Sequence, residues 1–346
     1  MRVEIVTPAS PVWAEILEAT DHDFYHLPGY AELCARTDRG SARALYVEDG
    51  ANRLLLPFVS RPIPTDPSRW DATSPYGYPG PLVHGPSMLD ERSAFAARAL
   101  EAAAPVLHEN GCVSLFVRLH PLLGPTPRPA NGTLVQHGET VFIDLTKSEA
   151  EHAAETASGH RYEIKRALKV GHRAFFDETF EHADRFVAIY QATMTRVGAS
   201  AYYFFDRDYL FSLREALGQR LKLAFVDIGG TLAAAGLFVE TGTGLQYHLS
   251  GTDEAFVRSQ PTKTMLDFVR SWGRSRGAKW LHLGGGVGGG QDSLFKFKAG
   301  FSKERSAFHT LRMVVDRRAY DALARAAHRN ADPVDATGFF PLYRRP

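Results

Sequence analysis

Short apolar runs separated by turn residues follow one another through the first third of the chain. Residues 42–63, ARALYVEDGANRLLLPFVSRPI, predict two strands joined by a hairpin at Asp49-Gly50. Residues 91–111 are rich in Ala, Leu and Glu, and they end at Asn110-Gly111, where a glycine can close a helix in the left-handed conformation. The next run, CVSLFVRL at residues 112–119, predicts a buried strand.

The same order of elements returns in the second half. Residues 221–240 predict two strands around Gly229-Gly230, and LQYHLSGTD at residues 245–253 predicts a third. A helix is predicted over residues 261–277, with Gly277 at its end and with Met265, Phe268, Val269 and Trp272 on one apolar face. It is followed by a strand (279–283), a glycine-rich loop, a short helix (292–301) and strands around 307–316. A meander, a helix, a strand and a short helix are the element order of a GNAT-type acyltransferase core. The fold class expected is therefore α/β (α+β), with two related halves.

Charge, cysteine content and hydropathy exclude some classes of function but favour none. The 346 residues carry 40 basic and 39 acidic side chains, so their total charge of +1 attracts neither DNA nor a membrane as a whole. The two cysteines form neither a CxxC pair nor part of a four-ligand Cys/His set with zinc spacing, and no metal is expected. The first residues lack a signal-peptide pattern and no stretch is apolar for the length of a membrane span, so we expect a soluble, cytoplasmic protein.

A basic segment separates the two halves. Residues 145–176 are expected to be helical, and Arg161, Lys165 and Lys169 recur every four residues on one face. A solvated helix face explains such charges equally well. The scarcity of acidic partners favours a surface that meets phosphate groups.

Several of these segments together resemble the FemXAB superfamily. They are SPYGYPGPLV (residues 74–83), the basic segment, YHLSGT (247–252) and LHLGGGVGGGQDSLFKFKAGF (281–301), and the resemblance extends from about residue 24 to 316. Members of that superfamily transfer amino acids from aminoacyl-tRNA and are best known for acting on peptidoglycan precursors. The resemblance implies two tandem GNAT-like domains, residues 1–150 and 151–316, with a cleft between them, and makes segment 317–346 a candidate for packing back on the first.

The resemblance also implies roles for individual residues. Phe297-Lys298 corresponds to the catalytic Phe-Lys pair of the superfamily, and the basic helix with Arg161, Lys165 and Lys169 becomes a tRNA-binding surface. Substrate-binding candidates are Tyr76, Tyr78, Arg196, Tyr203, Tyr247, His248, Gly285 and Gly286. Tyr76 stands where a cation is more usual, which leaves the acceptor open between a muropeptide and a small amine of specialised metabolism.

The residues themselves leave alternatives open. Lys298 could offset charge on the oxyanion of acyl transfer, or it could lie on the polar flank of a helix whose Leu294, Phe297 and Phe301 are buried. Strand alternation should point one of Tyr247 and His248 inward, and we expect this to be Tyr247. The aromatic run at residues 201–211 could stack on a base or form core.

The function expected is an aminoacyltransferase that joins an amino acid from aminoacyl-tRNA to an amine, acting as a monomer without a bound cofactor. One alternative is a coenzyme-A-dependent N-acyltransferase, although FVRSQPTKTML (256–266) lacks the glycines of a pyrophosphate loop and places Pro261 at the helix start. The other is a non-catalytic binding module with the same fold. The glycine loop has neither P-loop nor dinucleotide spacing, so we expect its glycines to let the backbone approach a substrate.

Overall fold

The computed structural model describes residues 1–327 and 338–345, which form two compact units. The first unit comprises Met1–Gly138 and Ala307–Pro346, and the second comprises Glu139–Ser306. The chain thus crosses from one unit to the other between Gly138 and Glu139 and returns between Ser306 and Ala307, somewhat before the positions 150 and 316 anticipated from the sequence.

The first unit is a mixed sheet with helices on both faces. Its strands lie in the order β1-β2-β3-β4-β6-β13, with β5 beside β3 and with a parallel pair at β4–β6. The strands are β1 (Arg2–Val6), β2 (Ser41–Asp49), β3 (Asn52–Ile63), β4 (Asp66–Thr73), β5 (Leu82–His84), β6 (Cys112–Arg118) and β13 (Arg305–Val314). The helices are α1 (Pro11–Ala19), η1 (Phe24–His26), α2 (Pro28–Thr37), α3 (Leu89–Glu109), α10 (Arg317–Ala326) and η6 (Leu342–Arg344).

The hairpin turn and the helix end predicted for this unit are both present. Strands β2 and β3 pair up to Asp49 and Asn52, and Gly50 between them has φ +61°. Helix α3 ends before Gly111, whose φ of +83° is the left-handed conformation expected of a glycine cap.

Alternation along the strands gives this sheet two distinct faces. Leu115 and Val117 of β6 join the core beneath α3, together with Leu311 and Met313 of β13. The residues between them therefore point to the opposite face. There Phe116 packs with Val113, with Tyr320 of α10 and with Phe340 of the C-terminal segment. Val113 reaches this face because the β4–β6 register shifts between Cys112 and Leu115.

The second unit repeats this arrangement. Its strands lie in the order β8-β9-β10-β11-β12-β7, with a parallel pair at β11–β12. They are β7 (Gly132–Asp144), β8 (Arg173–Phe176), β9 (Leu221–Ile228), β10 (Thr231–Glu240), β11 (Gly244–Thr252) and β12 (Trp280–Gly284). The helices are α4 (Glu149–Glu155), α5 (Ser158–Lys169), α6 (Ala183–Arg196), η2 (Ala201–Tyr203), α7 (Arg207–Leu217), η3 (Gly218–Arg220), η4 (Glu254–Ser259), α8 (Pro261–Ser275), η5 (Val287–Gly289) and α9 (Ser293–Ala299).

Helix α8 covers one face of the second sheet, and α6 contacts the strands β10 and β11. As predicted, the apolar face of α8 packs on the sheet: Met265 and Val269 are buried in the core, and Phe268 and Trp272 pack against it partly buried. The expected glycine cap is also present, because Gly277 after α8 has φ +78°.

The basic segment is less regular than predicted. Residues 145–176 hold two short helices, α4 and α5, followed by the strand β8, rather than one continuous helix. The first break lies at Thr156 and Ala157, which both have ψ near 130–140°. The second lies at Gly171, with φ +91°, where the chain turns into β8.

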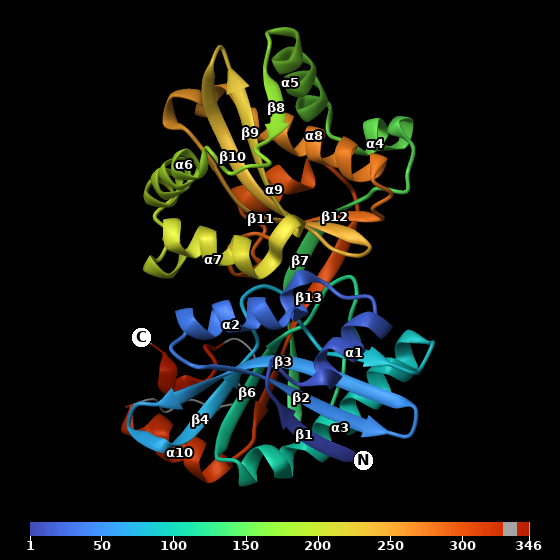
Figure 1. The fold of residues 1–346 in the computed structure, drawn as a ribbon, viewed down its shortest axis with the longest axis vertical. Helices are drawn as coiled ribbons and strands as arrows, with labels where there is room; N and C mark the ends of the chain where they lie inside the picture. Colours follow the sequence, from blue (N-terminus) through green and yellow to red (C-terminus); the bar gives the residue numbers. More distant parts are fainter. Residues whose placement is uncertain (328–337, 346) are drawn as a thin grey trace. The chain divides into compact units, whose positions relative to one another are not determined.

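A single exchange of strands links the two repeats. Strand β7 follows β6 in the chain but pairs with β12 of the second unit, whereas β13 follows α9 and pairs antiparallel with β6 of the first. Figure 1 colours the two strands green and orange-red, which marks how far apart they lie in the sequence. The first sheet therefore receives its sixth strand, β13, from beyond the second repeat, whereas the sixth strand of the second sheet, β7, comes from the segment that directly precedes that repeat.

Among the described residues, no helix has the length and apolar character required to cross a membrane.

The close approach of β11 and β12 yields a stability prediction. A Cβ on Gly244 would lie 2.2 Å from ring atoms of Trp280. We expect Gly244→Ala to lower the free energy of unfolding by about 2 kcal/mol because the buried ring has to move. Gly242→Ala is the matched control, since its Cβ would meet nothing within 4 Å. Urea unfolding of both variants checks this, and equal stabilities would contradict the packing described.

Candidate functional site

The glycine loop between β12 and α9 is folded around one carboxylate. Asp292 is the N-cap of α9 and accepts hydrogen bonds from the backbone N–H of Phe295 (2.8 Å) and of Val287 (3.0 Å). These bonds lower the pKa of Asp292, so it carries a negative charge at the start of the helix. One side chain thus holds the loop and the helix in a fixed relation.

Lys298 is buried on the inner side of α9. The residue is only 8% exposed, and its Nζ donates a hydrogen bond to the carbonyl oxygen of Gly285 at 2.7 Å. Burial lowers the pKa of Lys298 from its ordinary value of 10.5 to about 8, and the charge of Asp292 partly opposes this shift. The ammonium has three donors and spends one of them on Gly285, so it can offer others to a developing oxyanion.

The alternative of a buried stripe made of Leu294, Phe297 and Phe301 holds only in part, since Phe301 is buried and Phe297 packs against the core. Leu294 is 41% exposed, whereas Phe295 and Lys298 face inward. A helix of seven residues makes less than two turns, and its capping by Asp292 decides which side is buried. The structure therefore does not place Lys298 on a solvated flank.

The backbone carbonyl of Phe297 is already occupied. It accepts a hydrogen bond from Nε2 of His160 on α5 at 3.0 Å, and the His160 ring lies edge-on to that of Phe301. A Cβ on Gly300 would lie 2.4 Å from the same imidazole, so a glycine is needed there. His160 escaped the sequence analysis because no local pattern links it to a residue far along the chain, while Asp292 had a signal in its position before SLF, which is typical of an N-cap.

Gly285 and Gly286 have internal reasons to be glycines. A Cβ on Gly286 would lie 2.1 Å from the carbonyl oxygen of Gly290, and one on Gly285 would lie 2.9 Å from that of Glu139. We expected these glycines to make room for a substrate, but at these two positions the group that comes close is the protein's own backbone. Gly285 contributes its carbonyl to Lys298.

Tyr247 and His248 lie at an irregularity of β11. The register pairs Phe238 with Tyr247 and Leu237 with Leu249, which leaves His248 as the extra residue of a β-bulge. Strict alternation, on which the sequence argument relied, does not hold at this point, and both side chains are half-buried. The Tyr247 ring stacks on Phe238, and burial raises its pKa to about 12.

His248 has the properties of a neutral imidazole. Burial lowers its pKa to about 4, and its Nε2 lies 3.3 Å from the hydroxyl of Tyr209 on α7. At neutral pH it can accept a proton only weakly.

Arg196 and Tyr203 are the last residues of α6 and η2, which follow one another in the second unit. Arg196 closes α6 and donates to the carbonyl oxygen of Thr252, the last residue of β11, at 3.2 Å. Tyr203 is 37% exposed, and its carbonyl oxygen accepts from the hydroxyl of Tyr190. Part of the aromatic run is core, because Phe205 is buried and stacks on Tyr209.

Tyr76 and Tyr78 belong to the first unit. The carbonyl oxygen of Tyr76 accepts a hydrogen bond from Tyr30, and the Tyr78 ring packs edge-on against Tyr25 and Phe308. Gly77 between them has φ +100° and would clash with Tyr25 if it had a side chain. The segment is held in place by aromatic packing.

The three cations of α5 have unequal surroundings. Arg161 donates to the carbonyl oxygens of Ala153 and Thr156 and so closes the end of α4. Lys165 and Lys169 lie on the exposed side of the helix. All three side chains are exposed, and Arg161 has in addition a structural role at the end of α4.

The start of α8 is where a GNAT domain would hold a pyrophosphate. Pro261 occupies the first position and supplies no N–H, and the preceding Gln260 is left-handed with φ +49°. Lys263 in the first turn is buried and forms an ion pair with Glu163 of α5. The helix start therefore offers one N–H donor fewer to an anion, and the charge of its nearby lysine is already paired. Among the described residues, no cluster of three or more His, Cys, Asp or Glu side chains is arranged to hold a metal.

Known proteins share this fold. Residues 154–298 match the acetyltransferase (GNAT) domain family. The crystal structure of FemX superposes with a TM-score of 0.70 at 13% identity, covering 93% of this chain and 99% of that one. L-PGS from Bacillus licheniformis gives a TM-score of 0.55 at 14% identity, with 90% and 94% covered, and a C-terminal domain assigned to a lysylphosphatidylglycerol synthetase of Agrobacterium fabrum gives 0.53 at 13% identity, with 91% and 96% covered. No curated protein matches in sequence.

These similarities confirm the predicted α/β fold of two tandem GNAT-like units, and at the level of the fold they confirm the resemblance to the FemXAB superfamily. The family model covers the part of the chain that holds the glycine loop and nearly all of α9, which is less than half of its length.

Burial of Lys298 has a consequence for stability. Because its folded pKa of about 8 lies below 10.5, the unfolded chain binds more protons between these values, so the wild type gains stability as pH rises from 8 to 10.5. Lys298→Met should therefore be more stable than the wild type at pH 7, by at most about 3 kcal/mol, with the difference shrinking towards pH 10.5. Urea unfolding at several pH values measures it.

The control for this experiment is Lys296→Met, since Lys296 is exposed on the same helix. A difference between Lys298→Met and the wild type that did not change with pH would contradict the lowered pKa.

Proposed function

We propose that this chain transfers an aminoacyl group from aminoacyl-tRNA to an amine and forms an amide. The observation that carries the proposal is the buried ammonium of Lys298, fixed at 2.7 Å from the carbonyl oxygen of Gly285 at the end of β12. A cation held in a desolvated place stabilises an oxyanion more strongly than one in water, and it needs no reorganisation during the reaction.

The reaction needs little else from the protein. The neutral amine attacks the ester carbonyl carbon, a tetrahedral oxyanion forms, and the bond to the ribose oxygen breaks while the amine proton passes to that oxygen. Lys298 offsets the charge on the carbonyl oxygen or on the leaving oxygen. Although burial lowers its pKa to about 8, Lys298 is still mostly protonated at neutral pH. No covalent enzyme intermediate and no bound cofactor are required.

The start of α8 supports tRNA over coenzyme A as the donor. Coenzyme A in GNAT domains is held by successive N–H groups at this helix start. Here Pro261 removes a donor, and Lys263 is paired with Glu163. Charged tRNA would make its phosphate contacts elsewhere, and Lys165 and Lys169 are available on α5. Since charged tRNA is a cytoplasmic substrate, we place the protein there. The acceptor in this proposal is a muropeptide or a small amine.

A second candidate function is N-acylation from an acyl-coenzyme A. It is favoured by the match of residues 154–298 to the acetyltransferase (GNAT) domain family. Lys298 would serve either donor, because both reactions pass through an oxyanion. An activity assay with each donor therefore has to distinguish aminoacyl-tRNA from acyl-coenzyme A.

Lys298→Ala should lower the rate of amine-dependent release of amino acid from charged tRNA by about a hundredfold or more, through loss of the oxyanion's cation. Lys296→Ala, two residues away and exposed, should keep the wild-type rate. The measurement is release of radiolabelled amino acid from a pool of charged tRNAs in the presence of extracted amines.

Consumption of acetyl-coenzyme A, with no release from tRNA above that in buffer, would overturn the tRNA proposal and support the second candidate. Amide formation retained in Lys298→Ala would remove Lys298 from the mechanism.

The surface of α5 provides a separate test of the donor. Replacing both Lys165 and Lys169 by Gln should raise KM for charged tRNA several-fold with little change in kcat, and the salt dependence of KM should become less steep. Arg98→Gln, on α3 of the first unit, removes an exposed cation as a control. An unchanged KM and salt dependence in the double variant would contradict a role of α5 in binding tRNA.

A further inference from the structure

A pocket in the first unit is lined by four arginines. It has a volume of about 280 Å³ and lies between the sheet and the C-terminal segment. Its lining residues are Arg61, Thr73, Phe116, Arg118, Arg312, Gly338, Phe339, Phe340, Pro341 and Arg344. The volume is just below the usual range for ligand pockets, so it suits a small molecule.

The strand register explains why these residues meet. Thr73 of β4 pairs with Phe116 of β6, and Phe116 pairs with Arg312 of β13, so the three form a row across the sheet. Arg118 lies two residues beyond Phe116 and points to the same face. This is the face away from α3, since Leu115 and Val117 belong to the core beneath that helix.

Two of the arginines are balanced by one carboxylate. Asp71 is fully buried and accepts from Arg61 at 2.7 Å and from Arg344 at 2.5 Å. Asp38 of the α2 end is a second acid within range of Arg61, Arg118 and Arg344, and burial raises its pKa. Among the described residues, cations therefore outnumber carboxylates around this pocket.

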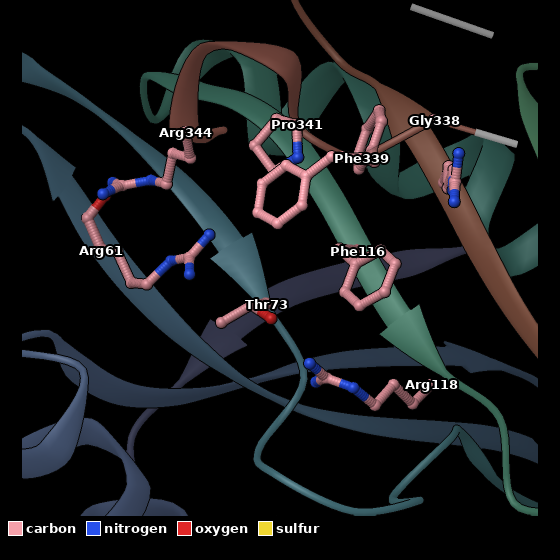
Figure 2. Close-up of a pocket in the computed structure, with 10 residues that line it drawn as sticks. Arg61, Thr73, Phe116, Arg118, Gly338, Phe339, Pro341 and Arg344 are labelled. Carbon is pink, nitrogen blue, oxygen red and sulfur yellow. The ribbon is translucent and has the colours of Figure 1, made fainter. Parts of the chain in front are cut away.

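Arg118 is the arginine best placed to meet a ligand. Its guanidinium lies over the Phe116 ring, 5.0 Å from the ring centre, and donates to the carbonyl oxygen of Ser74 at 3.3 Å. A guanidinium has five N–H donors, and within the described chain this is the hydrogen bond that the Arg118 side chain makes. Figure 2 shows the guanidinium groups of Arg61 and Arg118 pointing from two sides towards Thr73.

The walls beside these cations are aromatic. Phe116 comes from the sheet, and Phe339 and Phe340 come from the C-terminal segment. Arg312 lies over the Phe340 ring at 5.8 Å, which holds its charge beside the pocket. A ligand with a flat body next to its anionic group would contact both kinds of surface.

We propose that this pocket binds the phosphate group of a small phosphorylated molecule. Guanidinium groups that approach from different directions suit a tetrahedral dianion better than a planar carboxylate, which one arginine can hold in bidentate fashion. The hydroxyl of Thr73 donates weakly to the carbonyl oxygen of Ser74 at 3.4 Å, and it can turn from that bond to donate to a bound phosphate. The proposal concerns the first unit alone and does not depend on the transferase function.

The test is isothermal titration calorimetry of the full chain at low salt, with phenyl phosphate, inorganic phosphate and succinate as probes. Phenyl phosphate should bind more tightly than inorganic phosphate, and succinate should bind at least about tenfold more weakly than phenyl phosphate. Arg118→Gln should lower the affinity for phenyl phosphate by about tenfold or more, the loss expected for a charge-assisted hydrogen bond.

Matched variants keep the result interpretable. Arg118→Lys retains charge without the planar fork and should fall between Arg118→Gln and the wild type. Thr73→Val preserves shape and should weaken binding even if Arg118→Gln does not fold. Arg98→Gln, on the opposite face of the sheet, should bind like the wild type within about twofold. Thermal unfolding reports which variants are folded.

Three outcomes would overturn the proposal: no heat of binding with either phosphate, equal affinity of folded Arg118→Gln and wild type, or succinate binding as tightly as phenyl phosphate.

Discussion

The exchange of β7 and β13 between the repeats is the constraint on which the structure depends. The first sheet is not complete within a continuous stretch of sequence, because β6 needs β13 from after the second repeat, whereas β7 leads from β6 directly into the second sheet and pairs with β12. Pairings between such distant segments have a high loop-closure cost and form late, so the two repeats are expected to fold as coupled units. The exchange also fixes the position of α9, which lies in the chain between β12 and β13.

Lys298 shows how this scaffold supports an unfavourable side chain. Desolvating an ammonium costs free energy, and the protein offsets the cost only in part, through the carbonyl oxygen of Gly285 and the charge of Asp292. A residue kept in place at the expense of stability is the usual sign of a functional site. His160 and Gly300 act in the same direction, because they fix the backbone of α9 from the outside.

Local chemistry made much of the fold predictable. The Asp49-Gly50 turn, the glycine after α3 and the apolar stripe of α8 each depend on neighbouring residues, and each is found in the structure. The failures have long-range causes. The buried side of α9 is decided by its cap and by α5, and the bulge at His248 by the pairing of β11 with β10. Spacing alone carries no information on either.

The arginine pocket could not be predicted from the sequence for a similar reason. It brings together residues from both ends of the chain, as when Arg344 donates to the carbonyl oxygen of Pro62. Its position nevertheless follows a rule that the two repeats share. Thr73 and Arg118 are the last residues of the parallel strands β4 and β6, and Gly285 directly follows the parallel strand β12. The carboxyl ends of parallel strands leave backbone groups and side chains facing outward at one edge, which is where α/β folds bind their ligands. Duplication of the fold thus provided two such edges, of which one is equipped with a buried lysine and the other with arginines.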